Sequence, residues 1–256
     1  MELVWAIILG IVEGATEFLP VSSTGHLIVV SQWLKIDQSE THIAFEIIIQ
    51  LGAILAVMAN YSDKFSIRHY ALWVKLFVAF LPLALVGFLL KDQIEMLFKN
   101  PVIVPSMFIA GGFVFLIVER FYTDNSIRTK EVEDITYLQA FWVGLAQILA
   151  LVPGTSRAGS TIVGSMLVGL SRKASAEFSF LLALPVMGAV CGYQFLKNYD
   201  IFSGGQFSTL IVGFITAFIV ALLSMKLLAH FLENYTFVPF GLYRIFFGAG
   251  LFWVLA

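Results

Sequence analysis

Two short segments of this sequence gather residue types that can act on a phosphate ester. In the first segment, Glu13 and Glu17 lie four residues apart, so a helix would place both carboxylates on one face. Two carboxylates on one face repel each other unless a cation or a proton lies between them. The pair therefore suits a divalent cation, a proton relay or a general base with its partner.

Hydroxyls and an imidazole follow this acidic pair. Ser22, Ser23 and His26 are spaced so that His26 lies three or four residues beyond a serine. On a helix that follows the break, a hydroxyl and the imidazole can share one face, which is the minimum for a nucleophile and its base. The serines also suit helix capping, which does not exclude a role in chemistry.

The second segment carries Ser156, Arg157, Ser160 and Thr161, and it puts Arg157 and Thr161 on one helix face. The fork of an arginine fits phosphate or carboxylate. Each segment follows a helix break, and free N–H groups at a helix start attract anions. With the two segments together, the residues suit a phosphate ester bridged by a metal ion better than a neutral sugar or an amino acid.

The composition indicates what must position these residues. Of 256 residues, 59% are hydrophobic and only 12% are charged. A soluble domain carries about 25% charged residues, so the sequence indicates a polytopic membrane protein. The net charge of −2 gives no basic surface for nucleic acid. The single Cys191 excludes a disulfide framework and a cysteine-based metal cluster.

Six apolar blocks are long enough to cross a bilayer at roughly 20 residues each. They are residues 41–60, 69–90, 102–121, 173–196, 207–231 and 239–255. Two further blocks, 2–34 and 136–169, are broken at residues 18–25 and 152–156 by proline, serine and threonine. Their halves are short for a crossing, so we expect two re-entrant helix hairpins.

The two broken blocks resemble each other. Gly10-Ile-Val-Glu13 aligns with Gly144-Leu-Ala-Gln147, and Pro20-Val-Ser-Ser23 aligns with Pro153-Gly-Thr-Ser156, at an offset of about 133 residues. A hairpin followed by three crossings ends on the opposite side, so the second copy starts inverted. We therefore expect an all-α membrane domain over 1–256 with an inverted-topology repeat, the copies covering about 1–130 and 131–256.

The loop charges predict the orientation. Seven basic residues mark one face and four mark the other, and the richer face is expected in the cytoplasm. The richer face carries Lys64, Arg68, Arg120, Arg128, Lys130, Arg172 and Lys173, and the other carries Lys35, Lys91, Lys99 and Lys197. Both termini and the mouth of the first hairpin then face outward. No basic residue precedes Lys35, so a signal peptide is not expected.

Three charged residues in the spans have no role in the two segments. Glu46 and Glu177 are interpreted as partners of the site or of neighbouring helices, and Arg244 as a snorkelling or pairing residue. Broken helices are also typical of transporters, so a lipid-phosphate transporter or flippase is the alternative function. A channel would need polar residues along a continuous pore, whereas here they cluster at the two breaks.

The residues from Glu13 to His26 resemble the first signature of the undecaprenyl-diphosphatase (bacitracin resistance) family, and those from Pro153 to Thr161 resemble its second. The resemblance extends over the whole chain, including Phe45–Gly52 and Ala176–Pro185. Ala158 departs from the pattern, because the family often has serine after the arginine. The other common design of lipid phosphatase needs a second histidine and an aspartate after its Ser-Arg motif, which this sequence lacks.

The resemblance implies hydrolysis of undecaprenyl diphosphate to the monophosphate carrier of peptidoglycan synthesis, with bacitracin resistance on overproduction. It implies a homodimer in the bacterial cytoplasmic membrane, with the site facing outward and Mg²⁺ or Ca²⁺ held by Glu13 and Glu17. Ser23 is the expected nucleophile with His26 as base or acid, while Glu17 as base or His26 as nucleophile stay open. The expected phosphate-binding residues are Ser22, Thr24, Ser156, Arg157, Ser160 and Thr161.

Overall fold

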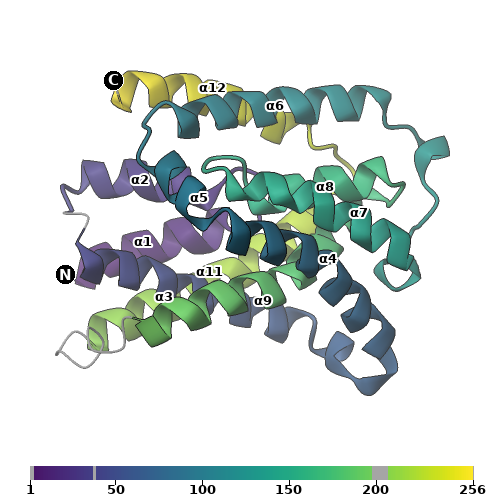
Figure 1. Cartoon of the computed structure of the whole chain (residues 1–256), viewed down its shortest axis with the longest axis horizontal. Helices are drawn as coiled ribbons and strands as arrows, with labels where there is room; N and C mark the ends of the chain where they lie inside the picture. Colours follow the sequence, from purple (N-terminus) through teal and green to yellow (C-terminus); the bar gives the residue numbers. More distant parts are fainter. Residues whose placement is uncertain (1–2, 37–38, 198–206, 256) are drawn as a thin grey trace.

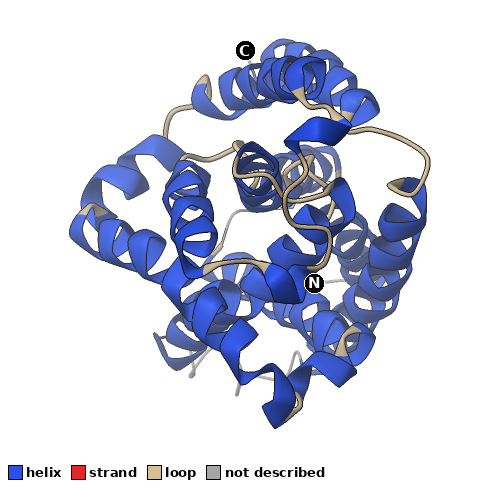
Figure 2. Ribbon diagram, turned by 90° about the vertical axis from the view of Figure 1, so that its right-hand side faces the viewer, coloured by secondary structure: helices blue, strands red, loops and turns tan. Residues whose placement is uncertain are grey.

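The computed structural model describes residues 3–36, 39–197 and 207–255 of the chain. Within these ranges the chain is helix and loop, without a strand (Figure 2), apart from one isolated bridge between Thr129 and Leu170. This agrees with the expected all-α class.

The α-helices include six that correspond to the predicted spans and four that form the two broken blocks. Their bounds are α1 Leu3–Thr16, α2 Ser23–Trp33, α3 Glu40–Asn60, α4 Tyr70–Leu89, α5 Lys91–Phe98, α6 Ile103–Phe121, α7 Tyr137–Gln147, α8 Arg157–Leu167, α9 Arg172–Lys197, α11 Phe207–Phe231 and α12 Val238–Leu255. Short 3₁₀ helices join them: η1 Ser62–Phe65, η2 Ile67–His69, η3 Asp124–Ser126, η4 Val132–Asp134 and η5 Ile148–Leu151.

The six predicted spans are observed as helices whose ends lie within one residue of the predicted ends. Four of them, α4, α6, α9 and α11, are long and apolar enough to cross a membrane. The other two, α3 and α12, contain shorter apolar stretches, Ala44–Asn60 and Val238–Trp253. Pro82 and Pro185 lie inside α4 and α9, as membrane bundles tolerate. The chain is therefore a multi-pass helical membrane protein.

Both broken blocks form pairs of short helices. The first block is α1, of 14 residues, and α2, of 11; the second is α7 and α8, of 11 residues each, with η5 after α7. Ser22 and Ser156 directly precede α2 and α8, with φ values of 65° and 76°. Non-glycine residues rarely adopt this region, and such strain costs of order 1–3 kcal/mol. The same unusual backbone thus recurs at both breaks.

The helices that leave the two breaks also end alike. Ile36 N–H donates to the carbonyl of Ser31, and Leu170 N–H donates to that of Ser165. The residue before each donor, Lys35 or Gly169, has a positive φ, of 54° or 94°. These bonds satisfy the last carbonyls of α2 and α8.

Each broken block packs against a span from the other half of the chain. Helix α1 packs on α11, and α7 packs on α4. Glycines allow the close approach: a Cβ at Gly10 would lie 2.7 Å from the carbonyl of Gly213, and one at Gly144 would lie 2.9 Å from Cα of Ala79. Helices α6 and α12 lie side by side along one edge of the molecule (Figure 1).

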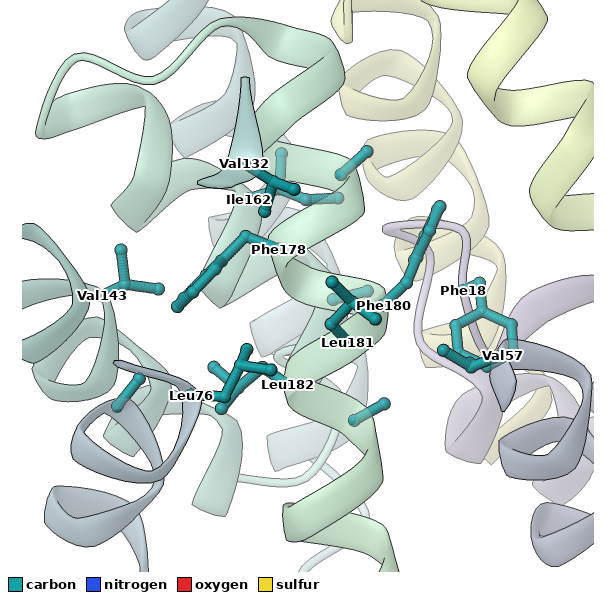
Figure 3. Packing of buried hydrophobic residues seen from close by; sticks show 14 of the residues in the cluster. Phe18, Val57, Leu76, Val132, Val143, Ile162, Phe178, Phe180, Leu181 and Leu182 are labelled. Carbon is teal, nitrogen blue, oxygen red and sulfur yellow. The ribbon is translucent and has the colours of Figure 1, made fainter. Parts of the chain in front are cut away.

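The largest buried apolar cluster extends from α4 and α7 through α9 to the first break. At its end Phe18, from the first break, meets the edge of Phe180 on α9, with 5.4 Å between ring centroids (Figure 3). Phe18 directly follows Glu17, so this packing fixes the backbone beside the acid.

Candidate active site

Glu17 joins the two breaks. One carboxylate oxygen accepts a hydrogen bond from the Ser23 hydroxyl at 2.7 Å, and the other pairs with Nη2 of Arg157 at 3.0 Å. The side chains of Glu17 and Arg157 are only 8% and 12% exposed. The structure therefore brings together three of the four residues expected to be catalytic, from segments about 140 residues apart in the chain.

Arg157 is held in place from α9. Its Nη1 donates to the carbonyl of Ser179 at 2.7 Å, and its guanidinium lies 5.8 Å from the centre of the Phe18 ring. The Ser179 hydroxyl is in turn 2.6 Å from the hydroxyl of Thr161. Nε of Arg157 is buried and has no hydrogen-bond partner among the described residues. The arginine is thus oriented while it keeps a donor in reserve.

A cavity of about 360 Å³ opens at this cluster. Six of the expected site residues line it: Glu17, Ser22, Ser23, Thr24, Ser156 and Arg157. Its remaining wall is largely apolar and comes from α4, α5, α9 and the second break; Leu83, Ile94, Phe98, Val186 and Met187 belong to it. A polar end joined to an apolar wall suits an amphiphile with an anionic head.

The starts of α2 and α8 both lie beside this cavity, but they are capped differently. The Ser156 hydroxyl accepts from the N–H of Gly159 at 3.0 Å, which satisfies one donor of α8. The side chain of Ser22 caps no N–H of α2. Amides at the start of α2 therefore remain suitable donors for an anion.

Ser160 and Thr161, which were expected to bind phosphate, are not brought to the cavity wall. Both are buried in α8, where the Ser160 hydroxyl donates to the carbonyl of Ser156 at 3.0 Å. Thr161 contacts Ser179, whose carbonyl accepts from Arg157. Through this contact Thr161 supports the arginine, and phosphate binding by these two hydroxyls stays a prediction.

His26 lies apart from the Glu17 cluster, and the expected contact with a serine hydroxyl is replaced by two others. Nδ1 donates to the carbonyl of Ser22 at 2.7 Å, and Nε2 lies 2.6 Å from the hydroxyl of Tyr243 on α12. Since a carbonyl only accepts, Nδ1 carries a proton, and Nε2 of a neutral ring accepts from Tyr243. The ring also stacks on Phe247, with 4.3 Å between centroids. His26 thus braces the strained backbone of Ser22.

Glu13 is the residue best suited to a metal ion. It is fully buried one turn before Glu17, and neither of its carboxylate oxygens has a hydrogen-bond partner among the described residues. A buried carboxylate without partners is costly, and a bound cation would relieve the cost. The described residues contain no group of three or more acidic, histidine or cysteine side chains that could hold a metal. The site thus fits Mg²⁺ or Ca²⁺ completed by phosphate and water.

The other charged residues of the spans make different contacts. Glu46 pairs with His42 at 3.0 Å, whereas Glu177 lies 3.6 Å from Lys64 and lines a separate cavity beside it. The interpretation of Arg244 as a snorkelling residue is wrong. The side chain is fully buried, and its guanidinium donates to backbone carbonyls in both breaks.

The sequence analysis also missed Ser179. Its position in an apolar run of α9 was the available signal, because a polar residue in a span is expected to have a partner. That partner, Arg157, lies 22 residues earlier in the chain. Helical spacing does not reach so far, so the signal did not identify the contact.

A family model described as bacitracin resistance protein BacA matches residues 6–250, which include every residue of the cavity. The chain belongs to the BacA family. It is 59% identical over 249 residues to an undecaprenyl-diphosphatase of Sulfurimonas denitrificans, covering 97% of each chain. It is 58% identical over 248 residues to undecaprenyl-diphosphatase 2 of Pseudoalteromonas translucida, covering 97% of this chain and 96% of that one.

A third BacA relative, an undecaprenyl-diphosphatase of a Sulfurovum species, is 53% identical over 255 residues and is matched over the full length of both chains. The recognition made from the two signatures is therefore confirmed. All three relatives carry the name of a phosphatase, so the comparisons do not support the transporter alternative.

Proposed function

We propose that this BacA protein is an integral membrane phosphatase that hydrolyses undecaprenyl diphosphate to undecaprenyl phosphate and phosphate. The observation that carries the proposal is the Glu17 carboxylate, which accepts from Ser23 and pairs with Arg157 at the polar end of a largely apolar cavity. The names of the relatives supply the substrate. The reaction recycles the lipid carrier of peptidoglycan synthesis, and overproduction confers bacitracin resistance.

The substrate fits the cavity with its head between the two breaks. Arg157 and the amides at the start of α2 bind the terminal phosphate, and Ser22, Thr24 and Ser156 add hydroxyl donors. The lipid chain leaves along the apolar wall, past Ile94 and Val186. When Arg157 turns to the phosphate, Glu17 loses its partner and becomes a stronger base.

The contacts of Ser23 favour Glu17 over His26 as its base. The Ser23 hydroxyl already donates to Glu17 at 2.7 Å, within the range needed for proton transfer. Oγ of Ser23 attacks the terminal phosphorus, Glu17 takes the proton, and the bond from this phosphorus to the bridging oxygen breaks. Undecaprenyl phosphate leaves, and Arg157 stabilises the charge on the transferred group. Water, deprotonated by Glu17, then releases phosphate and returns the proton to Ser23.

Glu13 and Glu17 are the proposed ligands of a divalent cation. Glu13 contributes two unpartnered oxygens, and Glu17 becomes available once Arg157 contacts the substrate. When bound, Mg²⁺ or Ca²⁺ would neutralise charge on the diphosphate oxygens.

The proposed topology is six spans plus two re-entrant hairpins, in an inverted repeat with copies at about 1–130 and 131–256. Three contacts support it, because exchanging the two copies turns the α1–α11 contact into the α7–α4 contact and maps the α6–α12 pair onto itself. The positive φ values of Ser22 and Ser156 recur at an offset of 134 residues, as do those of Lys35 and Gly169. The backbone therefore pairs the copies one residue away from the alignment of the proline motifs.

The cavity is proposed to open to the outside of the bacterial cytoplasmic membrane. Ile94 and Phe98 of α5 line it, and Lys91 and Lys99, from the face with fewer basic residues, flank these two residues in the sequence. Lys64 and Lys173 line a separate cavity and belong to the basic face. We also expect a homodimer in the membrane, which cross-linking of the native membrane would detect.

Phosphate release by the purified protein in detergent tests the function. The substrate is a long-chain isoprenyl diphosphate, with and without a chelator, for wild type, Ser23→Ala and Ser106→Ala. Ser106 also sits on a helix, but its hydroxyl donates to its own turn, to Val102, so Ser106→Ala is a matched control. Cation-dependent release lost only in Ser23→Ala supports the proposal. Substrate binding without release from wild type would instead support the transporter.

A further inference from the structure

Arg244, in the middle of α12, binds both breaks at once. The side chain is fully buried. Nη1 donates to the carbonyl of Pro20 in the first break at 3.1 Å, and Nη2 donates to that of Gly154 in the second break at 3.0 Å. Nη2 and Nε also donate to the carbonyls of Met107 and Phe108 on α6, at 2.9 and 3.3 Å. One guanidinium thus links three segments that are distant in the chain.

The partners of Arg244 distinguish it from an ordinary buried ion pair. All the hydrogen bonds described for it go to backbone carbonyls, and its guanidinium lies 5.1 Å from the centre of the Phe108 ring. Broken helices leave carbonyls without partners, and burying such groups is costly. Arginine satisfies several at once because it carries five N–H donors in a rigid plane.

The two loop carbonyls are close in sequence to the reacting residues. Pro20 is three residues before Ser23, and Gly154 is three residues before Arg157. Both side chains must reach Glu17, over 2.7 and 3.0 Å. A displacement of one break against the other by about 1 Å would lengthen these contacts beyond hydrogen-bond distance.

We propose that Arg244 is a positioning residue for phosphate hydrolysis, which fixes the two breaks in register so that Ser23, Glu17 and Arg157 meet around the terminal phosphate. The inference rests on the proposed function of the same cavity. Arg244 acts through the backbone of the breaks and does not touch the substrate. Its loss is therefore felt mainly in the rate of the chemical step.

Gly111 on α6 gives a second way to displace this guanidinium. A Cβ at Gly111 would lie 2.9 Å from Cζ and 3.0 Å from Nε of Arg244, so Gly111→Ala forces the end of the side chain to move. Gly241 supplies a matched control in the same pair of helices. A Cβ there would meet the carbonyl of Gly112 at 3.0 Å and the side chain of Leu116, with Arg244 not among its nearest contacts.

The experiment measures kcat, KM and the thermal midpoint of purified full-length protein in detergent, with a long-chain isoprenyl diphosphate as substrate. The variants are Arg244→Lys, Gly111→Ala and Gly241→Ala. In Arg244→Lys and Gly111→Ala, kcat is expected to fall by up to about 100-fold while KM changes far less, because misplacement by about 1 Å costs that much. Gly241→Ala is expected to keep its kcat.

A combined variant separates positioning from stability. If Arg244 acts through Arg157, adding Gly111→Ala to Arg157→Lys lowers kcat far less than the product of the two single effects. Unchanged kcat in Gly111→Ala overturns the inference, as does a loss of activity that follows the folded fraction in all three variants. No phosphate release from wild type would refute the proposed function itself, and the role of Arg244 with it.

Discussion

Replacing Glu17 with glutamine tests the proposed reaction most directly, because one carboxylate serves two partners. Its oxygens accept from Ser23 at 2.7 Å and pair with Arg157 at 3.0 Å. Glutamine keeps the shape and removes the charge. The variant therefore loses a base for Ser23, and it leaves Arg157 buried without an anionic partner until the phosphate binds.

Two magnitudes follow for Glu17→Gln. A positioned general base contributes about 10²–10⁴-fold to the rate, so kcat should fall by that factor. Breaking a buried ion pair costs roughly 3–5 kcal/mol, and the low end is expected because Arg157 keeps the Ser179 carbonyl and the Phe18 ring. KM should stay level or fall, because Arg157 no longer has to leave an internal anion before it binds phosphate.

The assay is steady-state phosphate release, combined with thermal unfolding in the presence and absence of inorganic phosphate. Phosphate should raise the unfolding midpoint of Glu17→Gln more than that of wild type, because it supplies the anion that Arg157 lacks. Glu133→Gln is the matched control, since Glu133 also pairs with a cation, Lys64, but lies outside the cavity. A kcat for Glu17→Gln within roughly tenfold of wild type would refute Glu17 as the base.

Three further predictions address the cation, the histidine and the effect of pH. Glu13→Gln should lose the activation of phosphate release by added Mg²⁺ or Ca²⁺ and should raise the thermal midpoint in chelator; full activation by the cation would exclude Glu13 as its ligand. His26→Ala should lower kcat but keep the shape of its pH profile, because the ring braces Ser22; loss of one limb of the profile would identify the histidine as acid or base. Burial raises the pKa of Glu133, but the hydrogen bond and charge of Lys64 outweigh it and hold the pKa below its usual 4.5. The stability from this pair is thus present above about pH 4.5 and lost below it, so the midpoints of wild type and Glu133→Gln should converge in acid; a gap that does not depend on pH would contradict this.

Local signals in the sequence were sufficient for the helices and the breaks. Apolar blocks of sufficient length predicted six helix ranges to within one residue, because the length of an apolar run sets what a bilayer can cover. Proline with serine or threonine marked both breaks, since Ser22 and Ser156 directly precede the second helix of each.

Contacts between distant segments were predicted less well, and His26 shows why. Spacing of three or four residues brings side chains together only within one regular helix. Ser22 lies outside α2 with a φ of 65°, and the Ser23 hydroxyl points back to Glu17. Arg244 failed for a related reason, because its partners are main-chain carbonyls, which carry no signal in the sequence.

The paired breaks also explain how a chain with two similar halves makes one asymmetric site. At the offset of 134 residues defined by the backbone, Ser23 corresponds to Arg157, and Glu13 corresponds to Gln147. The halves therefore share a loop geometry but divide the chemistry, since one supplies the nucleophile and acids and the other the guanidinium. Neither half alone could neutralise Glu17 or bind a phosphate beside Ser23. The site exists only where both breaks meet, which is the place that Arg244 fixes.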